Sequence, residues 1–95
     1  MIKYCYAYYN KLGNFYGMPF FVDHKEEFPS ILRQSLYAAK KEQLEELQEE
    51  ELYLIGSFNN ETGEFKAEKE FVTALSGMVS EILAKKFRGE EHGQA

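Results

Sequence analysis

The stretch from Leu52 to Phe65, LYLIGSFNNETGEF, constrains the fold more than any other part of the chain. Its first half, up to Phe58, is apolar and rich in aromatic and branched residues, as is typical of a buried strand. The residues from Asn59 to Gly63 tolerate positive φ and form side-chain turns, and an extended pattern resumes at Glu64. We therefore predict a β-hairpin with a loop of about five residues that ends on a glycine, where a G1-type bulge is expected. Simple alternation places Tyr53 and Ile55 on one side of this inner strand, with Leu54 and Phe58 on the other.

A strand is also predicted at the N-terminus, because residues 2–9 alternate in type. One face would carry Ile2, Tyr4, Tyr6 and Tyr8, and the other Lys3, Cys5, Ala7 and Tyr9. A turn over residues 10–13 would allow Phe15 and Tyr16 to pair back as a short second strand.

Two amphipathic helices are predicted from apolar residues that recur at intervals of three and four positions. The first begins near Phe28, with Pro29 in its first position, and the second runs from about Glu68 to Phe87. These elements define an α+β class, in which a small antiparallel β-sheet packs against two amphipathic helices in the order β(β)-α-β-β-α. We expect a single domain over residues 1–89 and a flexible C-terminal tail over 90–95.

The segment from Lys40 to Glu51 is strongly acidic, with glutamates at positions 42, 45, 46, 49, 50 and 51. One interpretation is a solvated helical extension or linker, which is the usual fate of a charge run. The other is a docking element for a basic partner, or a projecting helix whose leucines bind a second subunit and make a homo-oligomer. The leucines concerned are Leu36, Leu44 and Leu47.

Composition argues against several classes of function. The formal net charge is −5, without the dense basic face of a duplex-coating protein. Cys5, His24 and His92 are too scattered in the sequence to indicate a metal site or a nucleophile beside a base, so we expect no enzyme, metal or cofactor. No apolar run approaches the roughly 18 residues of a membrane span, and a lone cysteine suits a reducing cytoplasm.

The tyrosines of the first strand have two interpretations. Aromatic side chains on an open sheet face stack unpaired bases without reading their sequence. Alternatively, Tyr4, Tyr6 and Tyr8 pack beneath a helix, which we favour for one of the two faces, and the face with Tyr9 is then open or buried in a dimer. Nearby lysines at positions 11, 66 and 69 provide a thin basic surround.

The hairpin sequence resembles a segment of the small nonstructural protein of gokushoviruses, single-stranded DNA phages of the microvirus group. The matching residues are Leu52, Tyr53, Ile55, Gly56, Phe58, Thr62, Gly63 and Glu64, and Met18-Pro19-Phe20-Phe21 resembles a second element of that family. The resemblance covers roughly residues 2–66, while the acidic segment and the helical tail from Ala67 are longer than the family pattern.

The resemblance implies a non-enzymatic accessory protein of viral genome replication in the cytoplasm of a bacterial host. It would associate with single-stranded DNA or with viral or host replication proteins. The residues expected to contact DNA are Lys3, Tyr4, Tyr6, Tyr8 and Lys11, with a second patch of Lys85, Lys86 and Arg88. The rival hypothesis is a protein-interaction or homo-oligomerisation module that uses the acidic helix and does not contact DNA.

Overall fold

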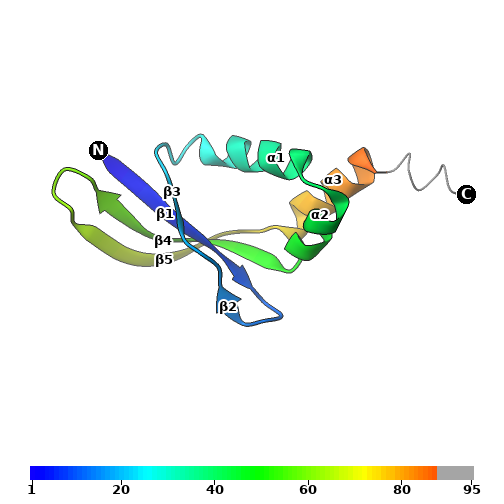
Figure 1. Ribbon diagram of the computed structural model, residues 1–95, viewed down its shortest axis with the longest axis horizontal. Coiled ribbons are helices and arrows are strands. Elements are labelled where there is room, and N and C mark those ends of the chain that lie inside the picture. The colour runs from blue at the N-terminus through cyan, green and yellow to red at the C-terminus, as the bar shows by residue number, and fades with distance from the viewer. Residues whose placement is uncertain (88–95) are drawn as a thin grey trace, which may run out of the picture.

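The computed structural model describes residues 1–87 as an antiparallel sheet with three helices, which confirms the α+β class (Figure 1). The strand order is β2-β1-β4-β5, and β3 pairs with β1 as well. The elements are β1 (Ile2–Asn10), β2 (Phe15–Tyr16), β3 (Phe20–Val22), α1 (Phe28–Ala38), α2 (Lys41–Leu47), β4 (Glu50–Asn59), β5 (Phe65–Ala74) and α3 (Ser76–Lys86).

The hairpin predicted from the sequence is formed by β4 and β5, and β4 is an inner strand between β1 and β5. Its loop is closed by the side chain of Asn59, whose Oδ1 accepts hydrogen bonds from the backbone N–H groups of Glu61 and Thr62 at 2.9 and 3.3 Å. Gly63 has a φ of 78°, which places it in the left-handed region where glycine is favoured. The predicted short strand also forms, since β2 pairs with the end of β1.

A bulge in β4 changes which side chains share a face. Cys5 pairs with Gly56 and Tyr6 pairs with Leu54, so Ile55 is left without a partner on β1. Beyond this point the alternation is shifted by one residue. Phe58 therefore lies on the same face as Tyr53, and the expectation that it shares a face with Leu54 is wrong.

The second predicted helix begins later than its apolar spacing indicates. Residues from Glu68 to Ala74 belong to β5, and α3 starts only at Ser76. Pairing with the ten residues of β4 takes precedence over the helix propensity of this segment, and Phe71-Val72-Thr73 is itself a run that favours strands. The turn between the two elements is held by the Leu75 N–H group, which donates to the Glu50 carbonyl at 3.0 Å.

The acidic segment forms a helix of its own. The first helix begins at Phe28 with Pro29 in its first turn, as predicted, and ends at Ala38. Ala39 and Lys40 are extended, with ψ values of 155° and 158°, so the chain changes direction before α2. Two helices were predicted, and this break makes them three.

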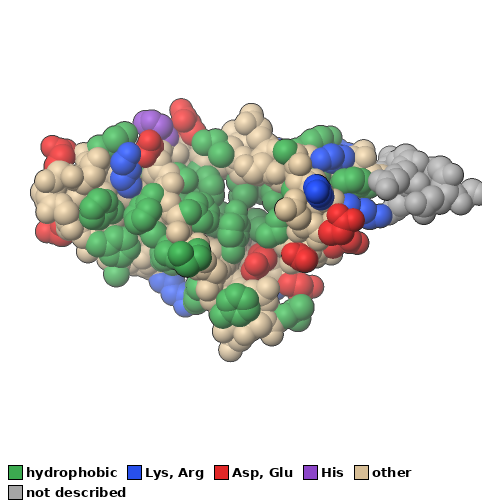
Figure 2. All heavy atoms as spheres, viewed as in Figure 1, with side chains coloured by type: hydrophobic (Ala, Val, Ile, Leu, Met, Phe, Trp, Pro, Cys, Tyr) green, Lys and Arg blue, Asp and Glu red, His purple; other side chains and the backbone are tan. Residues whose placement is uncertain are grey.

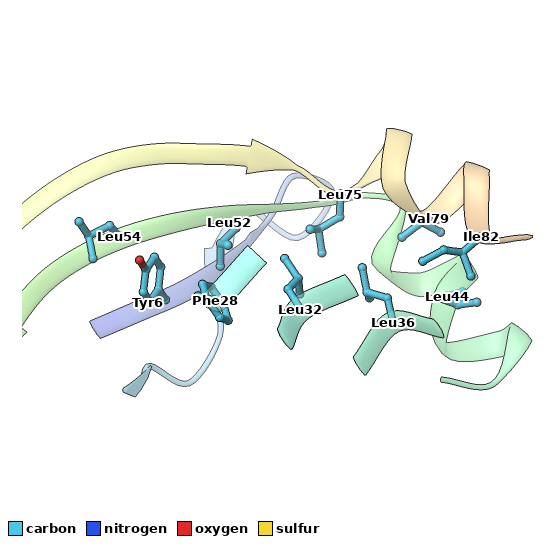
Figure 3. Packing of buried hydrophobic residues seen from close by; sticks show 10 residues of the cluster. All are labelled: Tyr6, Phe28, Leu32, Leu36, Leu44, Leu52, Leu54, Leu75, Val79 and Ile82. Carbon is cyan, nitrogen blue, oxygen red and sulfur yellow. The ribbon is translucent and has the colours of Figure 1, made fainter. Parts of the chain in front are cut away.

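The core lies between one sheet face and the helices (Figure 3). Tyr6, Leu52 and Leu54 project from the strands toward Phe28 of α1, and the same cluster continues to side chains of α2 and α3. The helix residues in this cluster are Phe28, Leu32, Leu36, Leu44, Val79 and Ile82, joined by Leu75 just before α3. Burying each large apolar side chain contributes about 1.5–3 kcal/mol.

This core settles where the leucines of the acidic segment lie. Leu36 and Leu44 are 3% and 0% exposed, and Leu47 is partly buried against the same cluster. The hypothesis that these side chains bind a second subunit is therefore wrong, because they are used to close the end of the protein's own core. The glutamates of α2 remain at the surface, where Figure 2 shows acidic side chains gathered beside α2 and the start of β4.

Candidate nucleic-acid interface

One face of the sheet is free of helices in the part of the chain that the structure describes (Figure 1). Backbone pairing assigns its residues, because directly paired residues project to the same side. Cys5 pairs with both Gly56 and Phe21, Ala7 with Tyr53, and Tyr9 with Tyr16. We call this surface the open face and define it by Lys3, Cys5, Ala7, Tyr9, Tyr16, Phe21, Glu51, Tyr53, Gly56, Phe58, Phe65, Ala67, Lys69, Phe71 and Ala74.

Four rings gather at one end of the open face, and we call them the tyrosine cluster. Tyr16 lies 4.8 Å from Tyr9 and 5.7 Å from Tyr53 between ring centroids, and Tyr53 lies 5.7 Å from Phe71. The pairs of Tyr53 with Tyr16 and Phe71 are edge-to-face, a favoured aromatic geometry. Tyr16 and Phe71 keep 40% and 52% of their surface exposed, so the cluster presents aromatic surface to solvent.

Lys69 adds a positive charge to this cluster. Its Nζ atom lies 5.0 Å from the ring centroid of Tyr16 and 5.5 Å from that of Tyr53, within the range of cation–π interaction. A hydrogen bond with the Tyr16 side chain raises the pKa of Lys69, so the ammonium group stays protonated. Desolvation among the rings raises the pKa of Tyr53, and the nearby Glu51 carboxylate acts in the same direction.

A second aromatic site occupies the other end of the open face. Phe21 and Phe58 lie 6.3 Å apart between centroids and border a hollow of about 440 Å³. Lys3, Asp23 and Asn60 complete its lining, and Lys3 Nζ lies 2.6 Å from Asp23 Oδ1. This hydrogen bond lowers the pKa of Asp23. Two apolar rings beside grouped donors and acceptors are suited to a flat, polar ligand such as a nucleobase.

Gly56 and Phe65 lie between these two sites. A Cβ atom on Gly56 would lie 2.4 Å from the Phe65 Cζ atom and 2.7 Å from the Lys66 carbonyl oxygen, far closer than real Cβ contacts. The glycine of the LYLIGSF sequence therefore allows the Phe65 ring to lie over the strand. Cys5 and Ala7 beside it are buried by larger neighbours, although none of the helices among residues 1–87 covers them.

The tyrosines proposed from the sequence as DNA contacts lie on the opposite face. Tyr6 is 2% exposed, with its ring centroid 4.5 Å from that of Phe28. Tyr4 and Tyr8 are partly buried against the same core cluster. Burial raises the pKa of Tyr6 and that of Tyr8. The expectation that these three rings stack bases is wrong, because they point to the face that packs against α1, where Phe20 of β3 lies beside Tyr6 and Tyr8. The favoured core interpretation describes them correctly.

The lysines proposed with them are dispersed. Lys3 is on the open face, while Lys11 is exposed in the turn after β1. Lys85 pairs with Glu81 at 3.0 Å. Lys86 donates hydrogen bonds to the carbonyls of Tyr37 and Ala39 at the end of α1, and so joins α3 to α1. Arg88 and the tail at 90–95 lie outside the described residues.

Sequence reasoning missed most of the aromatic residues of the open face. Alternation along the strands does place Tyr9 and Tyr53 on the side away from the helices, and this was the sequence signal from which the open face could have been predicted. What local patterns do not contain is the pairing of β2 and β3 with β1, which brings Tyr16 and Phe21 to this face. The bulge at Ile55 and the extension of β5 add Phe58 and Lys69 in the same way.

Other kinds of site find no support in the described residues. Among residues 1–87, no three His, Cys, Asp or Glu side chains are grouped so that they could hold a metal ion. None of the helices in this part of the chain has the length and apolar character needed to cross a membrane. Comparison with known proteins gave no matching family model, no matching curated protein and no matching solved structure.

Proposed function

We propose that the protein is a non-enzymatic accessory factor of phage genome replication that associates with single-stranded DNA through its open face, in the cytoplasm of a bacterial host. The setting rests on the resemblance of the hairpin sequence to the gokushovirus nonstructural protein. The observation that carries the binding mode is the helix-free sheet face with two aromatic sites, each beside a lysine.

The geometry favours single strands over duplexes. A duplex hides the faces of its bases in the stack, whereas an unpaired base offers a flat surface to an exposed ring, worth about 1–3 kcal/mol per base. Lys3 and Tyr9 are six positions apart on β1, which corresponds to about 20 Å at the rise of a strand. The two aromatic sites are therefore far enough apart to hold different nucleotides of one strand.

The charge distribution indicates that stacking rather than phosphate contact supplies most of the affinity. Lys69 lies beside the tyrosine cluster together with the Glu51 carboxylate, and Lys3 is already paired with Asp23. The net charge of −5 opposes DNA at long range. Since each phosphate contact adds about 0.7 to the salt slope for a single strand, one or two contacts predict a slope of about 0.7 to 1.4.

Fluorescence anisotropy with a labelled oligothymidylate and a labelled duplex, measured across salt concentrations, tests this function. We expect binding of the single strand with a shallow salt slope and little binding of the duplex. Lys69→Gln should weaken binding and flatten the slope, whereas Lys85→Gln, which removes a lysine paired with Glu81 on α3, should leave both unchanged. Absence of single-strand binding even at low salt would refute the proposal.

The second candidate is a protein-interaction module. Its support is the acidic surface of α2, whose glutamates remain exposed after its leucines are buried in the core (Figure 2). A basic protein surface is the partner that such a helix would attract. This candidate predicts no DNA binding and a partner affinity that is lost when Glu42 and Glu45 are replaced by glutamine.

A further inference from the structure

The outer edge of the sheet at β5 is long and unpaired in the part of the chain that the structure describes. β5 has ten residues and pairs with β4 alone. Residues 65–72 are all exposed. Natural proteins protect such an edge by shortness, proline, a covering segment, charged side chains or bulges. Among the described residues β5 is long, uncovered and without proline, but it carries four charged side chains, and its pairing with β4 has two register shifts. An exposed edge of this kind is a template for pairing with another strand.

We propose that β5 pairs antiparallel with β5 of a second copy of this chain, around a two-fold axis that passes through Glu68. A two-fold axis perpendicular to the sheet keeps the open faces of both copies on one side. In this register Lys66 lies opposite Glu70 of the second copy, and Glu70 lies opposite its Lys66. The same register places Phe65 opposite Phe71, again twice, so charged residues meet opposite charges and aromatic residues meet aromatic residues.

The two neighbouring registers that also keep both open faces on one side have less favourable charge pairs. Centring the axis on Ala67 places Glu64 opposite Glu70 twice, against two attractive pairs of Lys66 with Glu68. Centring it on Lys69 places Glu68 opposite Glu70 twice and Lys69 opposite itself. Like charges directly opposite one another destabilise a strand pair, and opposite charges stabilise it. The register centred on Glu68 has two attractive pairs and one repulsive pair, which makes it the best of the three.

The rings of the open face also favour a second copy over an unrelated strand. Phe65 and Phe71 are about half exposed in the single chain, and in this register Phe65 of one copy stands opposite Phe71 of the other on the open face. Lys66 and Glu70 project to the other side of β5, and neither takes part in an ion pair among the described residues. They are therefore available to each other across the axis.

The cost of this register is the pair of Glu68 carboxylates at the axis. Since they would face one another directly, they weaken the dimer. This gives an unusual expectation: Glu68→Gln should tighten association although it removes a charge from an exposed strand. The inference does not depend on the proposed function, because association is measured without nucleic acid.

Sedimentation velocity over a range of protein concentrations tests the inference. We expect a concentration-dependent dimer, weakened on the order of tenfold by Lys66→Glu or by Glu70→Lys, because two cross-strand pairs change from attractive to repulsive. The double variant with both substitutions restores the charge pairs and should recover the affinity of the native chain. Lys11→Glu changes the net charge equally at a remote turn and should have no effect.

Circular dichroism separates loss of pairing from loss of folding, since the substituted residues are exposed and each variant should keep the native spectrum. A chain that stays monomeric at the highest attainable concentration, with Glu68→Gln monomeric as well, would overturn the inference. A dimer that the charge reversals leave unchanged, or that the double variant fails to restore, would equally overturn it.

Discussion

Gly56→Ala is a small change with a large expected effect, because the surroundings of Gly56 have no room for a methyl group. The added Cβ would lie 2.4 and 2.7 Å from two atoms of the Phe65 ring and 2.7 Å from the Lys66 carbonyl oxygen. The ring can turn away at moderate cost, but the carbonyl belongs to the backbone of the paired strand β5. Overpacking of this kind costs about 1–3 kcal/mol.

For a domain of this size such a loss lowers the melting temperature by about 4–8 °C for each kcal/mol. Urea unfolding followed by circular dichroism should show a lower midpoint with an unchanged slope. Adding Phe65→Ala to the variant should recover only the part that is caused by the ring. The matched control is Gly77→Ala in α3, where nothing lies within 4 Å of the new Cβ and alanine should stabilise the helix by up to about 1 kcal/mol.

A Gly56→Ala variant as stable as the native chain would refute the reasoning, because it would mean that β4 and Phe65 are not arranged as described. Full recovery by Phe65→Ala would show that the ring alone limits the space, and not the β5 backbone.

Three further changes test the core, the hairpin loop and a partly buried carboxylate. Leu44→Ala should lower the free energy of unfolding by about 2–5 kcal/mol in urea titrations. Leu12→Ala, at an exposed turn, should change it by less than about 0.5 kcal/mol. Equal effects of the two substitutions would contradict the placement of α2 in the core. Gly63→Ala should cost about 1–2 kcal/mol because its φ of 78° is left-handed, and a neutral result in the same titration would contradict this loop geometry. Burial raises the pKa of Glu50 above its ordinary 4.5, and one of its carboxylate oxygens is buried without a partner among the described residues. The native state then binds the proton more tightly than the unfolded chain, so the free energy of unfolding falls as pH rises from about 4.5 through the folded pKa. Glu50→Gln should be more stable than the native chain at neutral pH and equal to it at acidic pH. A variant that is less stable at neutral pH would contradict this.

The hairpin could be predicted from the sequence because its determinants are local. Asn59 to Gly63 contains the turn chemistry that the structure uses, with Asn59 accepting from the loop backbone and Gly63 at positive φ. The start of α1 at Phe28 was equally local, since Pro29 fixes the first turn.

The boundary between β5 and α3 could not be predicted in this way. From Glu68 to Glu70 the residues favour a helix, and the apolar spacing continues smoothly into α3. They form a strand because they pair with β4. The length of β4 and the register of this pairing cannot be predicted from the residues of β5. Tertiary pairing overrides local propensity here.

The candidate site likewise contains features that follow from local sequence and features that depend on tertiary pairing. Alternation separates Tyr9 from Tyr8, but only the structure shows that the helices cover Tyr6 and Tyr8 and leave Tyr9 open. The tyrosine cluster joins residues from β1, β2, β4 and β5, and such a surface follows from strand order and bulges rather than from any single segment.

The central claim is that exposed rings of the open face stack the bases of single-stranded DNA, and one comparison of variants tests it most directly. Tyr16→Ala and Tyr53→Ala remove rings of the tyrosine cluster, and Tyr37→Ala removes an exposed ring of α1 that lies away from the open face. Affinities for the same labelled oligothymidylate are measured by anisotropy at one salt concentration. At about 1–3 kcal/mol per stacked base, each cluster variant should lose about five- to hundredfold in affinity, while Tyr37→Ala binds as the native chain does. Equal affinities for all three variants would contradict the claim.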